Sequence, residues 1–165
     1  MKGKYFKGSG RFPLFLNIKI AAYAAAIPRN KSKLVFHLLI NLHTISFSES
    51  CTGGMLASMI VNISGSSSVF KESIVTYSNE AKVKYLQVNP KTLKQYGAVS
   101  NETVIEMAEG LKFLTGCDVS VAVSGIAGPT GGTKLKPVGL VHYAIKINDN
   151  MYVESQQFHG DRNMI

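Results

Sequence analysis

The chain predicts an α/β fold, a three-layer α/β/α sandwich with a mixed sheet ending in an antiparallel hairpin. Apolar segments of strand length alternate with helical segments after residue 33, and such sheets are covered by helices on both faces. Near the end, residues 138–147 and 151–158 flank an Asn-Asp-Asn turn, which is typical of a hairpin. The length of 165 residues, with 45% hydrophobic and 17% charged residues, indicates about one globular domain.

Each element of the first half follows from a local pattern. Residues 33–42 are predicted to form a short helix, and the apolar run 44–48 a buried strand. Two glycines after that strand indicate a tight turn that opens a helix over 54–63, in which Met55, Met59 and Ile60 have helical spacing. A strand over 74–78 and a helix over 79–86 follow.

The second half contains one long helix, a strand and the hairpin. Asn101 is a plausible N-cap for a helix that reaches residue 114, with Glu102 and Glu106 near its positive end. Gly116 is expected to close that helix in a left-handed conformation. Residues 119–123 are mostly small or β-branched and predict a strand before the hairpin.

The formal net charge of +8 does not indicate a nucleic-acid-binding domain. Eight basic residues and no acidic ones precede Glu49, whereas from Glu49 onward there are ten of each sign. The excess charge therefore belongs to the N-terminal region, and no nucleic-acid partner is expected for the globular part.

Cysteines and histidines do not predict a metal site. Cys51 and Cys117 are expected to be reduced thiols, and the four histidines are scattered without zinc-ligand spacing. The glycine-rich segments match neither a dinucleotide fingerprint nor a P-loop. We expect no metal and no cofactor.

The segment 12–27 is apolar apart from Asn17 and Lys19 and follows a basic start, a profile that superficially resembles a secretory signal peptide. Lys19 inside the run and Pro13 near its start argue against that interpretation. About 16 residues is also short for a membrane span. We therefore expect no membrane partner and a cytoplasmic location, while attachment through residues 12–27 is an alternative that fractionation would test.

Two glycine-rich loops are candidate ligand sites. Glu49-Ser50-Cys51-Thr52-Gly53-Gly54 combines nucleophilic side chains with a helix start whose unoccupied N–H groups are expected to seat an anion. Residues 125–132 follow the strand 119–123 and expose many backbone N–H groups, which suits a phosphate or an oxyanion. Arg162 offers a forked donor for phosphate or carboxylate.

An ordered set of motifs resembles one family. The set begins with Glu-Ser-Cys-Thr-Gly-Gly and continues with Val-Thr-Tyr-Ser-Asn-Glu-Ala-Lys from Val75 and Gly-Ala-Val-Ser from Gly97. It ends with Ser-Gly-Ile-Ala-Gly-Pro-Thr-Gly-Gly from Ser124, Lys-Pro-Val-Gly from Lys136 and Gly-Asp-Arg from Gly160. This series is similar to the CinA C-terminal domain family, the nicotinamide-nucleotide amidases, over about residues 33 to 165.

The resemblance implies an amidohydrolase that converts nicotinamide mononucleotide to nicotinate mononucleotide and ammonia. It implies a Ser/Tyr/Lys set, matched here by Ser50 as nucleophile or water-orienting group, Lys82 as base and Tyr77 as proton relay or orienting hydroxyl. Cys51 is the rival nucleophile by chemistry alone, but no partner histidine stands at a recognisable spacing. The expected substrate-binding residues are Thr52, Gly53, Gly54, Gly125, Ile126, Ala127, Gly128, Gly131, Gly132 and Arg162.

The resemblance also divides the chain into an atypical tail, residues 1–32, and an amidase domain, residues 33–165. Because family members often carry a further N-terminal domain, the tail is interpreted as the remnant of one, and a disordered leader is the alternative. The family normally continues into a last helix, so the domain is expected to lack it. The partners implied are a pyridine nucleotide and a second copy of the chain in a homodimer. A non-catalytic descendant that still binds nucleotide is the alternative.

Overall fold

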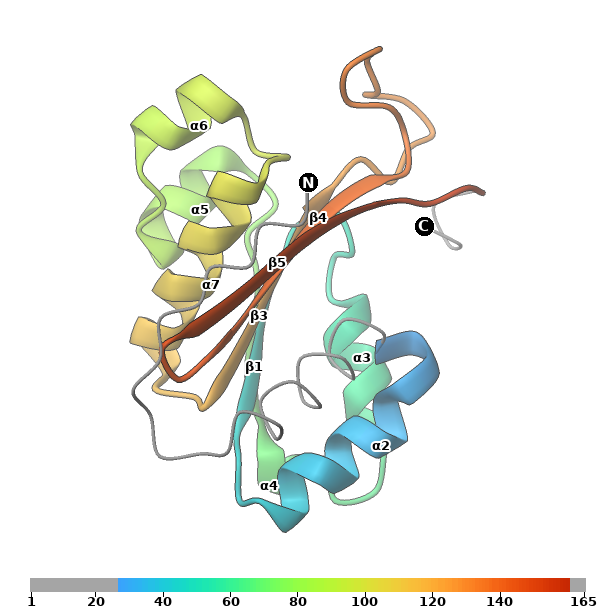
Figure 1. The fold of residues 1–165 in the computed structure, drawn as a ribbon, viewed down its shortest axis with the longest axis vertical. Helices are drawn as coiled ribbons and strands as arrows, with labels where there is room; N and C mark the ends of the chain where they lie inside the picture. Colours follow the sequence, from blue (N-terminus) through green and yellow to red (C-terminus); the bar gives the residue numbers. More distant parts are fainter. Residues whose placement is uncertain (1–26, 161–165) are drawn as a thin grey trace.

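The computed structural model describes residues 27–160, which form a five-stranded mixed sheet with helices on both faces (Figure 1). The strand order is β2-β1-β3-β4-β5, and the predicted α/β class and terminal hairpin are confirmed. Expectations for residues 1–26 and for Arg162 lie outside the described residues. The strands are β1 (Ile45–Glu49), β2 (Phe70–Val75), β3 (Val119–Gly125), β4 (Leu140–Ile147) and β5 (Asn150–Gln157).

Two groups of helices cover the two faces of the sheet. In Figure 1 one group, α2 to α4, lies on the right of the sheet and the other, α5 to α7, lies on the left, which makes the three predicted layers. The helices are α2 (Ile27–Ile40), α3 (Met55–Val61), α4 (Ser66–Val69), α5 (Asn79–Leu86), α6 (Pro90–Tyr96) and α7 (Asn101–Thr115).

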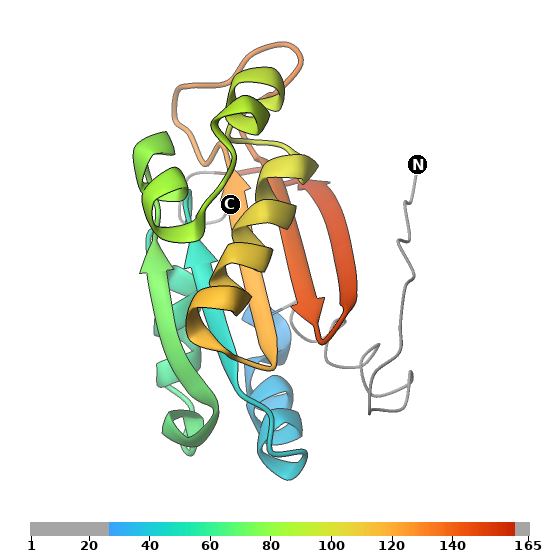
Figure 2. The ribbon, with the colours of Figure 1, turned by 90° about the vertical axis from the view of Figure 1, so that its left-hand side faces the viewer.

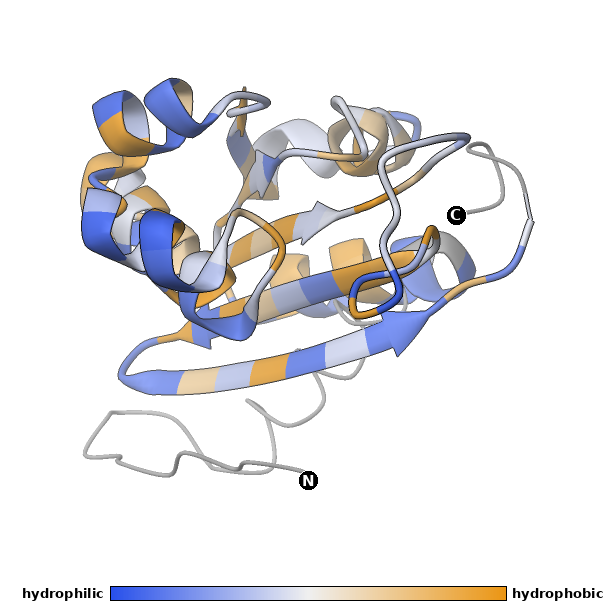
Figure 3. Cartoon of the chain, turned by 90° about the horizontal axis from the view of Figure 1, so that it is seen from above, coloured by the Kyte–Doolittle hydropathy of each residue, from blue (hydrophilic) through white to orange (hydrophobic). Residues whose placement is uncertain are grey.

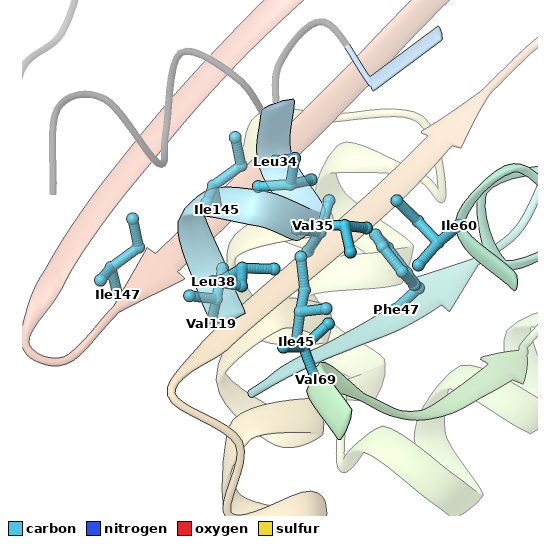
Figure 4. Close-up of a cluster of buried hydrophobic side chains, with 11 residues drawn as sticks. Leu34, Val35, Leu38, Ile45, Phe47, Ile60, Val69, Val119, Ile145 and Ile147 are labelled. Carbon is cyan, nitrogen blue, oxygen red and sulfur yellow. The ribbon is translucent and has the colours of Figure 1, made fainter. Parts of the chain in front are cut away.

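Each face of the sheet has its own apolar core. On the first face, Leu34, Val35 and Leu38 of α2 point toward the strands and pack with Ile45 and Phe47 of β1 (Figure 4). The second face is covered mainly by α7, whose buried apolar residues pack against the strands and α5. That second cluster consists of Leu86, Val88, Leu93, Val104, Met107, Ala108, Leu111, Ala122 and Ala144.

Strands β1, β2 and β3 run parallel, and β4 and β5 run antiparallel to their neighbours. In Figure 2 the arrows of the three parallel strands point the same way, so their carboxyl ends meet at one edge of the sheet. In the strand order β5 is the edge strand at the far end from β2, and its second half is exposed and hydrophilic (Figure 3). Polar residues on an edge strand oppose pairing with other chains. Because ligands of open α/β sheets bind at the carboxyl ends of the strands, the ligand site is expected at the carboxyl edge of β1, β2 and β3.

Most predicted elements are present, with shifts at their ends. Helix α2 begins at Ile27 rather than at residue 33, and β2 runs from Phe70 to Val75 rather than over 74–78. Helix α5 has the predicted bounds. The sequence interpretation missed α4 and α6, although α6 has a visible signal, a proline at its start and an Asn89 cap that accepts from the Lys91 N–H at 2.9 Å.

The predicted cap of α7 is wrong by one residue. Ser100, not Asn101, caps the helix, and its hydroxyl accepts from the Thr103 N–H at 3.2 Å. The Asn101 side chain instead contacts His142 Nδ1 of β4 at 2.7 Å, a long-range contact that local pattern does not reveal. Gly116 closes α7 with φ +64°, as predicted.

Candidate active site

Ser50 follows directly on β1 at the carboxyl edge of the parallel strands. Its N–H donates to the carbonyl of Val123 in β3 at 3.1 Å, so the backbone of Ser50 is held in the sheet. Gly53 and Gly54 have φ of +59° and +105°, a region that side chains with a Cβ rarely adopt. The strand, the tight turn and the helix α3 that were predicted around Ser50 are all present.

Lys82 reaches Ser50 from α5, the helix that follows β2 in the chain. The start of α5 is fixed by Ser78, whose hydroxyl accepts from the Ala81 N–H at 3.1 Å. Lys82 lies one turn into that helix, has no exposed surface, and directs Nζ to Ser50 Oγ at 3.0 Å. Nζ also donates to the carbonyls of Thr76, at 2.7 Å, and Tyr77, at 3.3 Å. The structure thus brings together two of the three side chains predicted to be catalytic.

Burial lowers the pKa of Lys82 from its ordinary value of 10.5, while the charges of Cys51 and Glu80 act in the opposite direction. A neutral lysine amine has two N–H donors and one lone pair. The carbonyls of Thr76 and Tyr77 can take the two donors, which leaves the lone pair for the hydroxyl proton of Ser50. This arrangement can remove a proton from Ser50.

The buried amine also makes stability depend on pH. Between the lowered pKa of Lys82 in the folded chain and 10.5 in the unfolded chain, the unfolded chain binds one more proton. The free energy of unfolding therefore rises with pH in that window. We expect the stability of the wild type relative to Lys82→Met to increase over the same window, as measured by urea denaturation at several pH values. Other titrating groups cancel in this difference, and a flat difference would contradict the lowered pKa.

Tyr77, the third predicted catalytic residue, contacts the pair through its backbone. Its carbonyl accepts from Lys82, whereas its side chain is 65% exposed just after β2. The phenol lies at the surface on the same edge of the sheet. Its role as a proton relay or orienting hydroxyl stays a prediction.

The expectation of unoccupied N–H groups at the start of α3 is wrong. The buried carboxylate of Glu49, the last residue of β1, fills this position and accepts five hydrogen bonds. Thr52 and Gly54, both predicted to bind substrate, are among its donors, so the Thr52 hydroxyl and the Gly54 N–H are already bonded to Glu49. Substrate binding by Thr52, Gly53 and Gly54 stays a prediction. The five donors are the N–H groups of Gly54, Leu56 and Ala57 and the hydroxyls of Thr52 and Ser73, at 2.7–3.1 Å.

The second glycine-rich loop begins at the end of β3, next to the strand that leads into Ser50. The loop is packed against Val138 at two points, because a Cβ on Gly128 or Gly132 would lie 2.7 Å from atoms of that residue. The Ile126 N–H is bonded to the carbonyl of Leu140 at 2.9 Å. An open hollow of about 590 Å³ lies against this loop. It is lined by Pro129, Thr130, Gly131, Gly132, Thr133, Lys134, Pro137 and Val138.

The remaining predicted binding residues, Gly125, Ile126, Ala127, Gly128, Gly131 and Gly132, belong to this loop and its strand, and their contacts with substrate stay a prediction. Two contributors to the site were missed: Glu49 and the Thr76 carbonyl. Glu49 could have been found as the charged residue next to Ser50 in the first motif. Thr76 contributes a backbone atom, for which no residue-type signal exists.

Among residues 27–160, no three His, Cys, Asp or Glu side chains are grouped so that they could hold a metal ion. Within the same residues, no helix has the length and apolar character that crossing a membrane requires.

A fully buried lysine against a serine hydroxyl, at the carboxyl edge of a mixed sheet between two helical layers, defines an α/β protein with a Ser–Lys pair. The family model for the CinA C-terminal domain matches residues 29–165. The chain belongs to this family, as the motifs indicated.

Individual relatives agree with this assignment. The chain is 56% identical over 122 residues to a CinA-like protein of Kosmotoga olearia, covering 74% of this chain and 30% of the relative. It is 52% identical over 128 residues to a putative competence-damage inducible protein of Clostridium novyi, covering 78% and 31%. The chain thus spans about a third of the length of these relatives.

Solved structures have the same fold. A CinA superfamily protein from Klebsiella pneumoniae superposes with a TM-score of 0.78 at 34% identity, over 81% of this chain and 83% of the other. A CinA superfamily protein from Escherichia coli gives 0.77 at 34% identity, over 81% and 77%. These matches confirm the α/β fold.

Proposed function

We propose that this domain is a nicotinamide-nucleotide amidase, which hydrolyses the carboxamide of nicotinamide mononucleotide to the acid and ammonia. The observation that carries the proposal is the 3.0 Å contact between Ser50 Oγ and the buried Nζ of Lys82. A serine next to an amine of lowered pKa is an activated nucleophile, which acyl transfer requires. The choice of substrate class rests on the resemblance of the motifs to the nicotinamide-nucleotide amidases.

In the proposed reaction Lys82 takes the hydroxyl proton as Ser50 Oγ attacks the carboxamide carbon. The C–N bond then breaks, the lysine returns the proton to the leaving nitrogen, and ammonia departs. Water hydrolyses the resulting ester by the same proton transfers in reverse order, releasing the carboxylic acid and Ser50. A variant of this scheme, in which Ser50 orients a water that attacks directly, gives the same products.

The substrate needs further contacts for its oxyanion and phosphate. We assign these to the 125–132 loop and to Arg162, because the N–H groups at the start of α3 already bind Glu49. The exposure of the Tyr77 side chain supports assigning it a contact with a substrate that enters from solvent.

The experiment is ammonia release from nicotinamide mononucleotide by the purified chain, with Ser50→Ala as the inactive reference. We expect release by the wild type, with kcat/KM rising with pH up to a value below 10.5, as the pKa of Lys82 is lowered by burial. A thermal melt with the nucleotide separates the alternatives. Stabilisation by nucleotide without any ammonia would overturn catalysis and favour a binding protein.

A further inference from the structure

Glu49 is a buried carboxylate with no part in the proposed chemistry. It precedes Ser50 in the chain and has no exposed surface, so it cannot touch a substrate. Its five hydrogen bonds come from three different segments: the turn after Ser50, the start of α3 and strand β2. Five bonds on one carboxylate are more than the N-terminal cap of the seven-residue helix α3 requires.

The same residue also links the two halves of the Ser–Lys pair. Its backbone carbonyl accepts from the Thr76 N–H at 2.8 Å, and the carbonyl of Thr76 in turn accepts from Lys82 Nζ at 2.7 Å. Its side chain binds Ser73 on β2 at 3.1 Å and the Gly54 N–H at 3.0 Å. Glu49 therefore spans the strand that carries Ser50 and the strand end that holds Lys82.

We propose that Glu49 is a positioning residue for the Ser50–Lys82 pair: its carboxylate holds the 50–54 turn against β2 and so sets the distance between Oγ and Nζ. This inference rests on the proposed function for its catalytic consequence. A displacement of about 1 Å at a reacting group can lower a rate by roughly 100-fold.

Glu49→Gln is the informative variant, because it keeps the size of the side chain. Each oxygen of Glu49 accepts at least one backbone N–H, from Ala57 on Oε1 and from Gly54 and Leu56 on Oε2. The NH₂ group of the carboxamide must therefore face a backbone N–H in either orientation, which is a donor–donor clash. Ser73→Ala removes a single bond to the carboxylate and is expected to have a smaller effect, about 2- to 10-fold.

The matched control is Asp118→Asn. The Asp118 carboxylate also accepts a backbone N–H and a hydroxyl, both from Thr44, at 2.8 and 2.9 Å. Thr44 precedes β1, so this bond pair lies at the end of the strand opposite Ser50. The control therefore makes the same carboxylate-to-carboxamide change at a hydrogen-bonded position far from the site.

The readout that does not depend on amide hydrolysis is covalent labelling by a fluorophosphonate. In that reaction Ser50 Oγ forms a bond to phosphorus, fluoride leaves, and Lys82 takes the hydroxyl proton. At a temperature where every variant is folded, we expect labelling and kcat to fall about 10- to 100-fold in Glu49→Gln, with KM within about 3-fold of the wild type. Amide hydrogen exchange at Gly54, Leu56 and Ala57 should be faster in the same variant, and Asp118→Asn should keep wild-type labelling.

The outcomes separate the two proposals. Wild-type labelling of Ser50 without ammonia release would remove the amidase function and leave the role of Glu49 testable by labelling alone. Wild-type labelling rates in Glu49→Gln despite faster exchange at 54–57 would overturn the positioning role. Absence of labelling in the wild type would overturn it too, since there would be no activated serine to position.

Discussion

Replacing Lys82 by methionine is expected to lower the kcat of ammonia release by about 10²- to 10⁴-fold, the range for loss of a general base. Methionine preserves the buried aliphatic stem but has no lone pair for the proton of Ser50, which Nζ contacts at 3.0 Å. Ser50→Ala should cause a loss at least as large. Because the two groups act as a unit, the double variant should be little worse than either single variant. Steady-state kinetics with nicotinamide mononucleotide measure all three.

Lys112→Met is the matched control for Lys82→Met. Burial also lowers the pKa of Lys112, and its Nζ likewise donates to two backbone carbonyls, those of Cys117 and Asp118, at 2.8 and 3.0 Å. These contacts lie beyond the C-terminal end of α7, away from Ser50, so the variant should retain wild-type kcat. Cys51→Ser tests the rival nucleophile and should also remain active. Loss of activity in Cys51→Ser together with retention in Ser50→Ala would reverse the assignment.

Gly110→Ala is expected to give the largest loss of stability from a single methyl group. Gly110 lies in α7 where this helix crosses the end of α5, and an added Cβ would overlap the carbonyl oxygen of Leu86 and lie 2.6 Å from its carbon. Backbone atoms cannot rotate away as a flexible side chain can, so the two helices must separate. We expect a loss of at least about 3 kcal/mol, even after the gain of about 1 kcal/mol in helix propensity. This corresponds to a fall in Tm of about 6–12 °C.

Gly116→Ala is the control for a glycine-to-alanine change in α7 or at its end that causes no steric overlap. No atom lies within 4 Å of the Cβ it would add, and the cost comes only from its φ of +64°, about 1–2 kcal/mol. In thermal melts, the Tm of Gly110→Ala should therefore lie below that of Gly116→Ala. A Tm for Gly110→Ala equal to or above that of the wild type would contradict the close packing of α5 on α7.

Much of the fold was predictable because it depends on local patterns. The helix over 79–86, the strand before Ser50 and the terminal hairpin follow from hydrophobic periodicity and turn residues, which act between near neighbours. Helix α6 carried a local signal that was not used. The cap of α7 was misplaced by one residue because both Ser100 and Asn101 are good caps, and only the contact of Asn101 with His142 decides between them.

The candidate site was predictable in part. Ser50 and Lys82 could be named from their motifs, but their contact joins residues 32 positions apart, and it exists because β1 and β2 are neighbours in register. The sequence could not reveal that the Tyr77 side chain faces solvent or that Glu49 occupies the N–H groups of α3. Both facts depend on which way a side chain points after the strands have paired.

By itself, the sequence determined the element types, the family and the motif residues, because helix and strand preferences and glycine turns are properties of short segments. The tertiary structure alone decided the burial of Lys82, the direction in which its pKa moves and the three hydrogen-bond partners of its Nζ. Burial and hydrogen-bond distance arise only when distant segments are packed together, and no local pattern encodes the desolvation of an amine.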